Sequence, residues 1–505
     1  MERHLACDVD AERRGAPASS LLLSVAAALL VLLVGSTFAL LVPAGAGFDE
    51  PMHVARVEQL AHGRVLPQEV DLDEADRTLV GPSSDDYVGY GGQTDAALYD
   101  LVARGNKSFF QDEDREPYQL PTWEDPRLAT EAQMGESTVT WLFPNTAINS
   151  PACYLPHIVG YWVASLLGLG PAAIVISMRL AGVLTLAAST LLCMRLLPVG
   201  GRLVALVALL PTSLTVNSMV TADLMTYVFV TVYLSCIVRM LLGDGARRRE
   251  WALLWLSLLG ICLSKVTYAP FGLLLFALPV ASPAYRAPRA LGMLAAIGFS
   301  SLAAFGLWYS VIHDVNTGLI WSADIDPTAQ QAWVLSNPLA FLGLMLMGLL
   351  GADTLALSMW TSYTGLVTAV WPTVLALLVV FSVELCSARL ARSGVRRSLI
   401  FCGFLAVVCA IVVVLVYLAL YLQFNAPGAA TIKGVQTRYF LPVALALYLI
   451  ALFVSRAATL RMAGDDAVRT DNVSASPAIM GDVLVLVALV TLSALNLFSF
   501  FWTCF

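Results

Sequence analysis

The sequence predicts an all-α polytopic membrane protein with about 11 transmembrane helices and a long first extracytoplasmic loop that carries interfacial helices. Two observations predict this class. Of the 505 residues, 58% are hydrophobic and only 13% are charged, and the mean hydropathy of +0.76 is far above that of a soluble chain of this size. Apolar runs long enough to cross a bilayer recur along the chain, and Arg residues gather in the short connections between them.

The apolar run at 20–42 is the expected first transmembrane helix. It follows residues 1–19, a segment of mixed charge that contains Arg13 and Arg14 and is therefore expected in the cytoplasm. The run exceeds the apolar core of a signal peptide, and no convincing small-residue cleavage site follows it, so we expect the helix to be retained.

Residues 43–170 form the expected extracytoplasmic loop, which begins rich in Asp and Glu. The Gly-rich stretch DDYVGYGGQTD at 85–95 and the acidic stretch QDEDREPYQL at 111–120 predict irregular loop with short helices. The last part is apolar and aromatic but is interrupted by Pro151 and Pro156. We therefore expect 153–168 to be a helix that lies in the membrane interface.

The remaining chain divides into a transmembrane core at 171–311, an extracytoplasmic loop at 312–364 and C-terminal transmembrane helices at 365–505, which end outside. The apolar stretch 338–351 is expected to be interfacial or re-entrant. Two short spans meet near Lys265, where we expect a bend or break of the kind found where backbone lines a cavity. The expected spans after the first are 171–194, 203–220, 223–243, 251–264, 267–284, 290–311, 365–386, 398–422, 439–455 and 481–502.

The stretch GFDEPMHVARVEQLAHGRVL, at 47–66, places titratable groups directly after the first membrane helix. Apolar residues recur at helical spacing from Pro51 onward, so an interfacial helix is expected to begin there. Asp49 and Glu50 then lie at its amino end, with His53 close behind. Carboxylates in this place can act as a general base or as metal ligands, and they can equally serve as helix caps.

Four cations, Arg179, Lys265, Lys433 and Arg438, lie at or near the expected outer ends of spans, where the orientation rule disfavours them. A charge near hydrocarbon costs several kcal/mol, so such residues are functional candidates by default. The alternative is that the side chains extend to the headgroups, which we expect for Arg179.

The expected topology brings four segments to the outer membrane face: FDEPMH at 48–53, NSMVTAD at 217–223, LSKVTYAP at 263–270 and KGVQTRYFLP at 433–442. Together they supply carboxylates, an amide and three cations. Transfer from a phosphate-linked donor needs such a set, because cations hold the phosphate while a carboxylate deprotonates the acceptor hydroxyl.

One membrane helix, an external loop that opens with Asp-Glu, an interfacial helix and many spans together resemble the GT-C superfamily of polyprenyl-phosphate-sugar-dependent glycosyltransferases. More closely, the DEPxH and GxQxRYFxP motifs, with HGRVLP, NSMVTAD and LSKVTYAP, resemble a bacterial, often actinobacterial, multi-pass membrane protein family of unknown function. The resemblance covers most of the chain. The two motifs are specific in combination, whereas the Asp-Glu pair alone is weak.

The resemblance implies roles for individual residues. Asp49 would be the catalytic base, and Glu50 would orient it or join in binding a metal. Lys265 and Arg438, and more weakly Lys433, would bind the donor phosphate. His53 would order the carboxylates or touch the acceptor, unless it is structural. Asn217, Asp223 and Tyr439 are cavity-lining candidates, although helix packing explains the first two equally well and an aromatic belt explains Tyr439.

No cofactor is certain. A divalent metal ion stays open, since the acidic pair Asp71 and Asp73 reads equally well as a metal-binding pair or as solvated surface. Most of the nine cysteines lie in or beside apolar runs and indicate small hydrophobic residues; the sequence does not decide whether Cys153 and Cys504, both on the expected outer side, pair. The net charge of −7 argues against nucleic acid as a partner.

The function expected from the sequence is a hexosyl- or pentosyltransferase of the plasma (inner) membrane. It would move a sugar from a polyprenyl-phosphate donor to a cell-envelope glycan or lipid-linked acceptor on the extracytoplasmic face. A transporter or flippase of a lipid-linked saccharide is the alternative, since intramembrane charges and broken helices also suit a transport path. A scaffold subunit with inactive motifs is a third reading.

Overall fold

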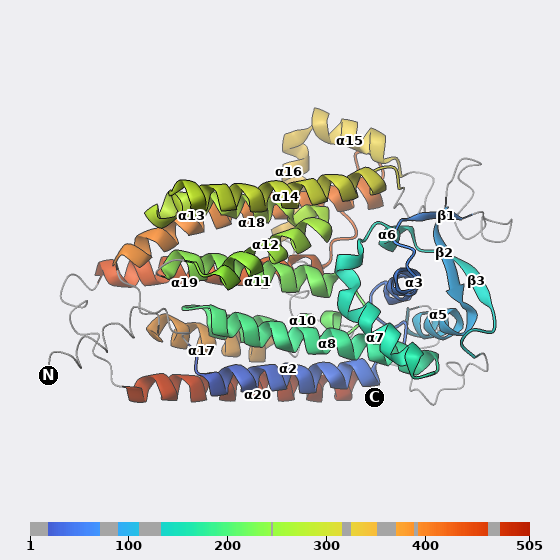
Figure 1. The fold of residues 1–505 in the computed structure, drawn as a ribbon, viewed down its shortest axis with the longest axis horizontal. Helices are drawn as coiled ribbons and strands as arrows, with labels where there is room; N and C mark the ends of the chain where they lie inside the picture. The colour runs from blue at the N-terminus through green and yellow to red at the C-terminus, as the bar shows by residue number, and fades with distance from the viewer. Residues whose placement is uncertain are drawn as a thin grey trace.

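The computed structural model describes residues 19–70, 89–110, 133–243, 246–315, 325–350, 370–387, 392–462 and 475–504. Long helices run side by side along the longest axis of the molecule (Figure 1). A small domain that includes α3 (Glu50–Ala61) and α5 (Ala96–Phe110) lies at one end of these helices (Figure 1). We call it the extramembrane domain.

The helix bundle contains both long and short elements. The long helices are α2 (Leu21–Leu41), α8 (Pro171–Leu196), α11 (Asp223–Leu242), α14 (Pro288–Ile312), α18 (Arg392–Phe424), α19 (Leu441–Met462) and α20 (Ala475–Cys504). The shorter elements are α9 (Gly201–Ala208), α10 (Pro211–Asn217), α12 (Arg248–Leu263), η3 (Val266–Phe276), α13 (Ala277–Ala281), η4 (Pro283–Tyr285), α15 (Pro327–Ser336), α16 (Pro338–Leu350), α17 (Val370–Ser387) and η7 (Thr437–Phe440).

In the part of the chain that the structure describes, seven helices are long and apolar enough to cross a bilayer, or eight if the bent pair α15 and α16 forms one span. The chain is therefore a mostly helical, polytopic membrane protein. The prediction of about 11 spans remains a prediction. Helices occupy the other expected positions, but α12 has only 16 residues and the 203–220 segment is divided into α9 and α10.

The helix break predicted near Lys265 is present, whereas the break between α9 and α10 was not predicted. α12 ends at Leu263, and after Ser264 and Lys265 the chain continues as the 3₁₀ helix η3. α15 and α16 meet at an angle of 103°, which fits the expected re-entrant or interfacial segment. At such breaks the backbone polar groups leave the helical ladder, so they need other partners or a polar environment.

The first membrane helix packs against helices from both halves of the chain. α2 begins after Ser20, whose hydroxyl caps Leu23 N–H at 3.2 Å. It lies against α8 and against α20 (Figure 1). The carboxyl end of α2 faces the extramembrane domain (Figure 1). The link from α2 to α3 contacts α8, because Arg179 of α8 donates to the carbonyls of Val42 and Pro43.

The extramembrane domain is built around α3, which packs against α5, α7 and β2. Val54, Val57 and Leu60 of α3 belong to a buried core with residues of α5, α7 and the start of α8. This core is separate from the larger hydrophobic core of the helix bundle. The other elements of the domain are β1 (Gln68–Val70), β2 (Gly89–Asp95), β3 (Thr138–Leu142), α6 (Pro144–Ala147), η2 (Pro151–Tyr154) and α7 (Leu155–Leu166).

Part of the Gly-rich stretch expected to be irregular loop is a strand, so that prediction is wrong for residues 89–95. β2 is the central strand of an antiparallel sheet, with β1 and β3 on its two sides. Glycine makes this pairing possible, because a Cβ on Gly91 would lie 1.9 Å from the Trp141 carbonyl oxygen. The predictions for residues 1–18, 71–88, 111–132, 316–324 and 351–369 lie outside the described residues.

The expected sidedness can be tested with single cysteines. Glu69 in β1 and Arg248 at the start of α12 are both exposed and lie on opposite sides of the predicted topology. In a chain whose Cys7, Cys386 and Cys504 are replaced by Ser, we expect Glu69→Cys to react with a membrane-impermeant maleimide in intact cells. Arg248→Cys should react only after permeabilisation.

Labelling of both variants after detergent solubilisation is the control for reactivity. The reverse pattern, with Arg248→Cys labelled and Glu69→Cys protected in intact cells, would invert the proposed orientation.

Candidate functional site

The candidate site forms where the ends of several membrane helices meet the extramembrane domain. Asp49 follows α2, Asp223 begins α11, Lys265 follows α12, and Arg438 lies in η7 just before α19. Side chains from all four segments are joined by the ion pairs described below. The four segments that the sequence places at one membrane face are therefore neighbours.

Glu50 is the anchor of the loop between α2 and α3. Its carboxylate is fully buried and forms a two-pronged ion pair with Arg179 of α8, at 2.7 Å from Nε and 2.6 Å from Nη2. The backbone N–H groups of Gly45, Gly47 and Val220 also donate to it, at 3.0–3.1 Å. Burial alone would raise the pKa of Glu50, but the Arg179 charge and these hydrogen bonds hold it below its ordinary value.

Arg179 uses its remaining donors on the end of α2. Nη1 donates to the carbonyl of Ala39 at 3.1 Å and to that of Val42, and Nη2 donates to that of Pro43 at 2.9 Å. The expectation that Arg179 extends to the headgroups is therefore wrong, because its side chain is 0% exposed. A guanidinium with this many fixed acceptors can stay charged without reaching water.

The Glu50 anchor fixes the backbone of Asp49. Asp49 has φ of 54°, the only positive φ at a non-glycine residue in the described chain. This left-handed conformation is uncommon for residues with a Cβ, although Asp tolerates it better than most. Gly45 serves the same loop, since a Cβ there would lie 1.9 Å from the Val102 carbonyl oxygen. The strained turn presents the Asp49 side chain away from the buried Glu50.

Asp49, Arg438, Asp223 and Lys265 form a line of alternating charges that we call the charge chain. Asp49 Oδ2 lies 2.5 Å from Arg438 Nη2, and Arg438 Nη1 lies 3.7 Å from Asp223 Oδ2. The other oxygen of Asp223 binds the ammonium of Lys265. Asp223 and Arg438 are nearly inaccessible, at 7% and 6%, whereas Lys265 is 25% and Asp49 41% exposed. The two ends of the charge chain are thus open.

Aromatic rings cover the cations of the charge chain. Tyr439 lies 5.4 Å from the Lys265 ammonium and 5.2 Å from the Arg438 guanidinium, and Phe48 lies 5.3 Å from that guanidinium. The Tyr439 hydroxyl also accepts a hydrogen bond from Arg438 at 3.3 Å. Tyr439 therefore belongs to the site, and not simply to an aromatic belt.

The charge chain controls the protonation of Asp49. Burial raises the pKa of Asp49, but the charge of Arg438 and its hydrogen bond outweigh burial and hold the pKa below the ordinary value. Asp49 is therefore ionised at neutral pH. While Arg438 is bound to it, the carboxylate is also a weak base.

His53 faces the charge chain from the first turns of α3 and is buried, at 6% exposed. Its Nδ1 lies 2.6 Å from the Tyr154 hydroxyl, which also accepts a hydrogen bond from Asn149 at 3.0 Å. Burial lowers the pKa of His53 to about 4, although Asp49 and Asp223 partly oppose this effect. His53 is therefore neutral at pH 7, and its fixed contact with Tyr154 favours the structural reading.

Two predicted site residues do not join the charge chain. Lys433 is exposed, its backbone N–H is held by Asn425 at 2.9 Å, and no ion pair of the described residues includes its ammonium. Asn217 is 0% exposed and donates to Ser213 within α10 at 3.2 Å, which favours the helix-packing alternative.

Metal binding stays untested. Within the described ranges no group of three or more His, Cys, Asp or Glu residues is arranged to hold a metal ion, and Asp71 and Asp73 lie outside those ranges. Glu50 is fully engaged by Arg179 and the backbone. Of its two expected roles, the structure therefore favours the orientation of Asp49. Cys153 is a free, buried cysteine.

Sequence reasoning missed three contributors: the pairing role of Arg179, and the contacts of Tyr154 and Phe48. The sequence contained one signal for the Arg179 pair. Arg179 lies inside an apolar run that contains no acidic residue, so its partner had to come from another segment. Tyr154 and Phe48 are ordinary aromatic residues near the membrane surface, and the sequence pattern contains no such signal for them.

Comparison with known proteins identifies a family. The family described as "Predicted membrane protein (DUF2142)" matches residues 32–447. The chain belongs to this family. The DUF2142 match includes the whole charge chain and the Glu50–Arg179 pair. No curated protein and no solved structure matches the chain.

The Glu50–Arg179 pair predicts a large effect on stability. Replacing Arg179 with Met leaves a buried carboxylate without its partner and should lower the free energy of unfolding by about 3–5 kcal/mol. We expect the melting temperature in detergent to fall accordingly. The double variant Arg179→Met, Glu50→Gln should recover much of the loss, because neither charge then stays buried alone.

Arg104→Met is the matched control, since Arg104 pairs with Asp100 on the surface, where an ion pair contributes about 0–1 kcal/mol. An Arg179→Met protein as stable as the Arg104→Met protein would contradict the anchoring role of this pair.

His53 predicts a loss of stability in acid. Its pKa in the folded protein, about 4, is lower than the ordinary value of 6.5, so the unfolded chain binds the proton first as the pH falls. The stability contribution present above pH 6.5 is lost as the pH falls toward 4, by about 2 kcal/mol at pH 5. The melting temperature of the His53→Gln variant should therefore fall less between pH 7.5 and 5 than that of the parent.

His313→Gln, at an exposed site, is the control. Parallel curves of melting temperature against pH for the parent and His53→Gln would refute the assignment.

Proposed function

We propose that this protein is a membrane glycosyltransferase that moves a sugar from a polyprenyl-phosphate donor to a hydroxyl of a cell-envelope glycan or lipid-linked acceptor on the extracytoplasmic face. The observation that carries the proposal is the charge chain, in which a partly exposed carboxylate lies next to a buried guanidinium and an accessible ammonium. Its place at helix ends beside the extramembrane domain gives lipid-borne and water-borne substrates access to one site.

The reaction would use the negative charge of Asp49 and the positive charges of Lys265 and Arg438. The acceptor oxygen attacks the anomeric carbon of the donor, and the bond from that carbon to the phosphate oxygen breaks. The acceptor proton passes to Asp49, and the departing polyprenyl phosphate takes the bond electrons. Lys265 and Arg438 stabilise the negative charge that develops on the phosphate, in the manner of other electrostatic catalysts.

The charge balance of the resting site adds a requirement. Two cations face two carboxylates, so a donor phosphate must compete with Asp49 and Asp223 for Lys265 and Arg438. Among the described residues the buried Nε of Arg438 has no hydrogen-bond partner, so the guanidinium has a donor to spare. A phosphate that binds there can draw the guanidinium away from Asp49.

This competition would activate the base. The Arg438 charge is what holds the pKa of Asp49 down, so a phosphate that neutralises Arg438 lets that pKa rise. Asp49 then becomes a stronger base at the moment the donor is present. Asp223 keeps both cations in place, and Glu50 positions the Asp49 backbone through Arg179.

A transporter or flippase of a lipid-linked saccharide is the second candidate. The breaks between α9 and α10 and between α12 and η3 favour it, because discontinuous helices often line transport paths. The charge chain counts against it, since it lies at one end of the helices next to the extramembrane domain (Figure 1). Movement of the lipid-linked sugar in vesicles without a new glycosidic product would establish the transporter.

The enzyme is tested with protein reconstituted in liposomes and a panel of polyprenyl-phosphate hexoses and pentoses, with an extract of envelope glycans as acceptor. Mass spectrometry of released polyprenyl phosphate and of glycosylated acceptor gives the rate. We expect Asp49→Asn to lower the rate by about 10²–10⁴-fold, the range for loss of a general base.

Asp100→Asn is the matched control, since it makes the same change at a partly exposed surface carboxylate, and its rate should equal that of the parent. Full activity of a folded Asp49→Asn protein would remove the proposed base.

A further inference from the structure

A cavity of about 480 Å³ lies in the extramembrane domain, away from the charge chain. Both features depend on α3. Glu58, which lines the cavity, lies about 13 Å from Asp49 along the axis of α3 and roughly 140° around this helix from His53. The cavity therefore faces a different side of α3 from the charge chain. Its volume is within the range of small-molecule sites.

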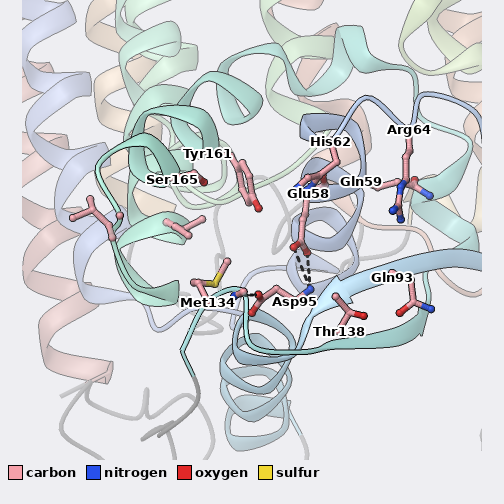
Figure 2. Close-up of a pocket in the computed structure, with 14 residues that line it drawn as sticks. Glu58, Gln59, His62, Arg64, Gln93, Asp95, Met134, Thr138, Tyr161 and Ser165 are labelled. Atoms are coloured by element: carbon pink, nitrogen blue, oxygen red, sulfur yellow. Dashed lines mark hydrogen bonds between the residues drawn. The ribbon is translucent and has the colours of Figure 1, made fainter.

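Helices α3, α7 and α8 and strands β2 and β3 all contribute to the walls of the cavity. Glu58 and Tyr161 point into it from α3 and α7, and Thr138 lies on the sheet side (Figure 2). Leu169 and Ile174, from the turn after α7 and the start of α8, give it an apolar side. The lining thus combines hydrogen-bonding groups with an aromatic ring and aliphatic surface, a mixture that suits a ligand with both hydroxyl groups and C–H faces.

Glu58 is one of the buried polar groups of this cavity, at 4% exposed. Both of its oxygens accept from the Asp95 N–H, at 3.1 and 3.3 Å (Figure 2). Burial raises the pKa of Glu58 to about 7, with the Asp95 charge adding to the effect and Arg64 opposing it. Near neutral pH this carboxyl can therefore both accept and donate a hydrogen bond, as a hydroxyl-bearing ligand requires.

Asp95 is occupied with the fold. Its Oδ1 caps α5 by accepting from Ala97 at 2.9 Å and from Leu98 at 3.3 Å, and its Oδ2 accepts from Gly135 at 2.6 Å. The cavity thus has one carboxyl available to a ligand. A metal ion is a poor occupant, because no group of three metal-ligating side chains lies among the described residues.

Exposed apolar side chains on α7 favour a position of the cavity beside the membrane surface. α7 presents Tyr161 to the cavity, while Val159 and Leu166 on other faces of the same helix are 51% and 88% exposed. A short helix with one face in a protein core and apolar side chains exposed on others is suited to lie in the interface. A ligand at headgroup level can therefore reach the cavity.

We propose that this cavity binds a saccharide unit that is distinct from the sugar and the hydroxyl that react at Asp49. The inference deepens and rests on the proposed function, for which it supplies a recognition subsite for a non-reacting sugar of the acceptor. The same chemistry is offered by a free glycan and by the headgroup of a glycolipid, so the test must include both.

The test is saturation-transfer NMR on the full chain in nanodiscs. One arm adds the methyl glycosides of glucose, galactose, mannose, arabinose and N-acetylglucosamine. The other arm compares nanodiscs with and without monogalactosyldiacylglycerol. We expect saturation transfer to sugar protons in at least one arm, and Thr138→Trp, which fills the cavity from its exposed edge, should reduce it at least fivefold.

Thr328→Trp is the matched control, since it makes the same change at an exposed threonine of α15, outside the cavity lining. Glu58→Gln, which keeps the shape of the side chain, provides a second variant should Thr138→Trp fold poorly, and it should also weaken the signal. Transfer with soluble glycosides indicates a free glycan ligand, and transfer with the glycolipid alone indicates a membrane-borne one.

The proposal is overturned if neither arm shows transfer, or if transfer is the same in Thr138→Trp and Thr328→Trp. Binding is measured without turnover, so the two proposals fail separately. Sugar binding that persists in a protein without transferase activity would leave the cavity assignment intact and remove the enzyme. Transferase activity without sugar binding at this cavity would do the opposite.

Discussion

The ion pair between Glu50 and Arg179 is the constraint on which the rest of the site depends. It joins the loop after α2 to α8. The same guanidinium donates hydrogen bonds to three carbonyls at the end of α2. Both partners are excluded from water. Such a pair is stable only when nearly every donor and acceptor is satisfied, and here backbone N–H groups complete the carboxylate shell. The cost of burying the two charges thus fixes one geometry for this loop.

That geometry places Asp49 at the surface of the site. Glu50 faces inward and Asp49, its neighbour, has left-handed backbone and faces Arg438. Two adjacent carboxylates consequently have different surroundings: Glu50 is a buried structural anchor, and Asp49 is partly exposed at one end of the charge chain. The difference between Glu50 and Asp49 follows from the partners of each carboxylate, because the two side chains have similar intrinsic acid strength.

The charge chain itself is electrically balanced. Asp49 and Asp223 neutralise Arg438 and Lys265, which allows two cations to remain at the ends of apolar helices without a bound anion. Under the proposed function, an arriving donor phosphate would change the partners of each carboxylate. The breaks at α10 and after α12 supply the helix ends from which these side chains project. α3 then links the charge chain to the cavity on its other side, so that one helix serves both parts of the extramembrane domain.

The sequence by itself determined the membrane class, the start of α3 near Pro51, the break at Lys265 and the convergence of the four motif segments. These follow from local composition and from the alternation of helix direction, which brings odd and even helix ends to opposite sides. The tertiary structure alone decided the partner of each charge. Arg179 and Glu50 are separated by 129 residues, and nothing in either local sequence specifies the other. The register of β2 with β3 and the cavity beside α3 were likewise settled by packing, because a close glycine contact and a space between several elements exist only after the chain has folded.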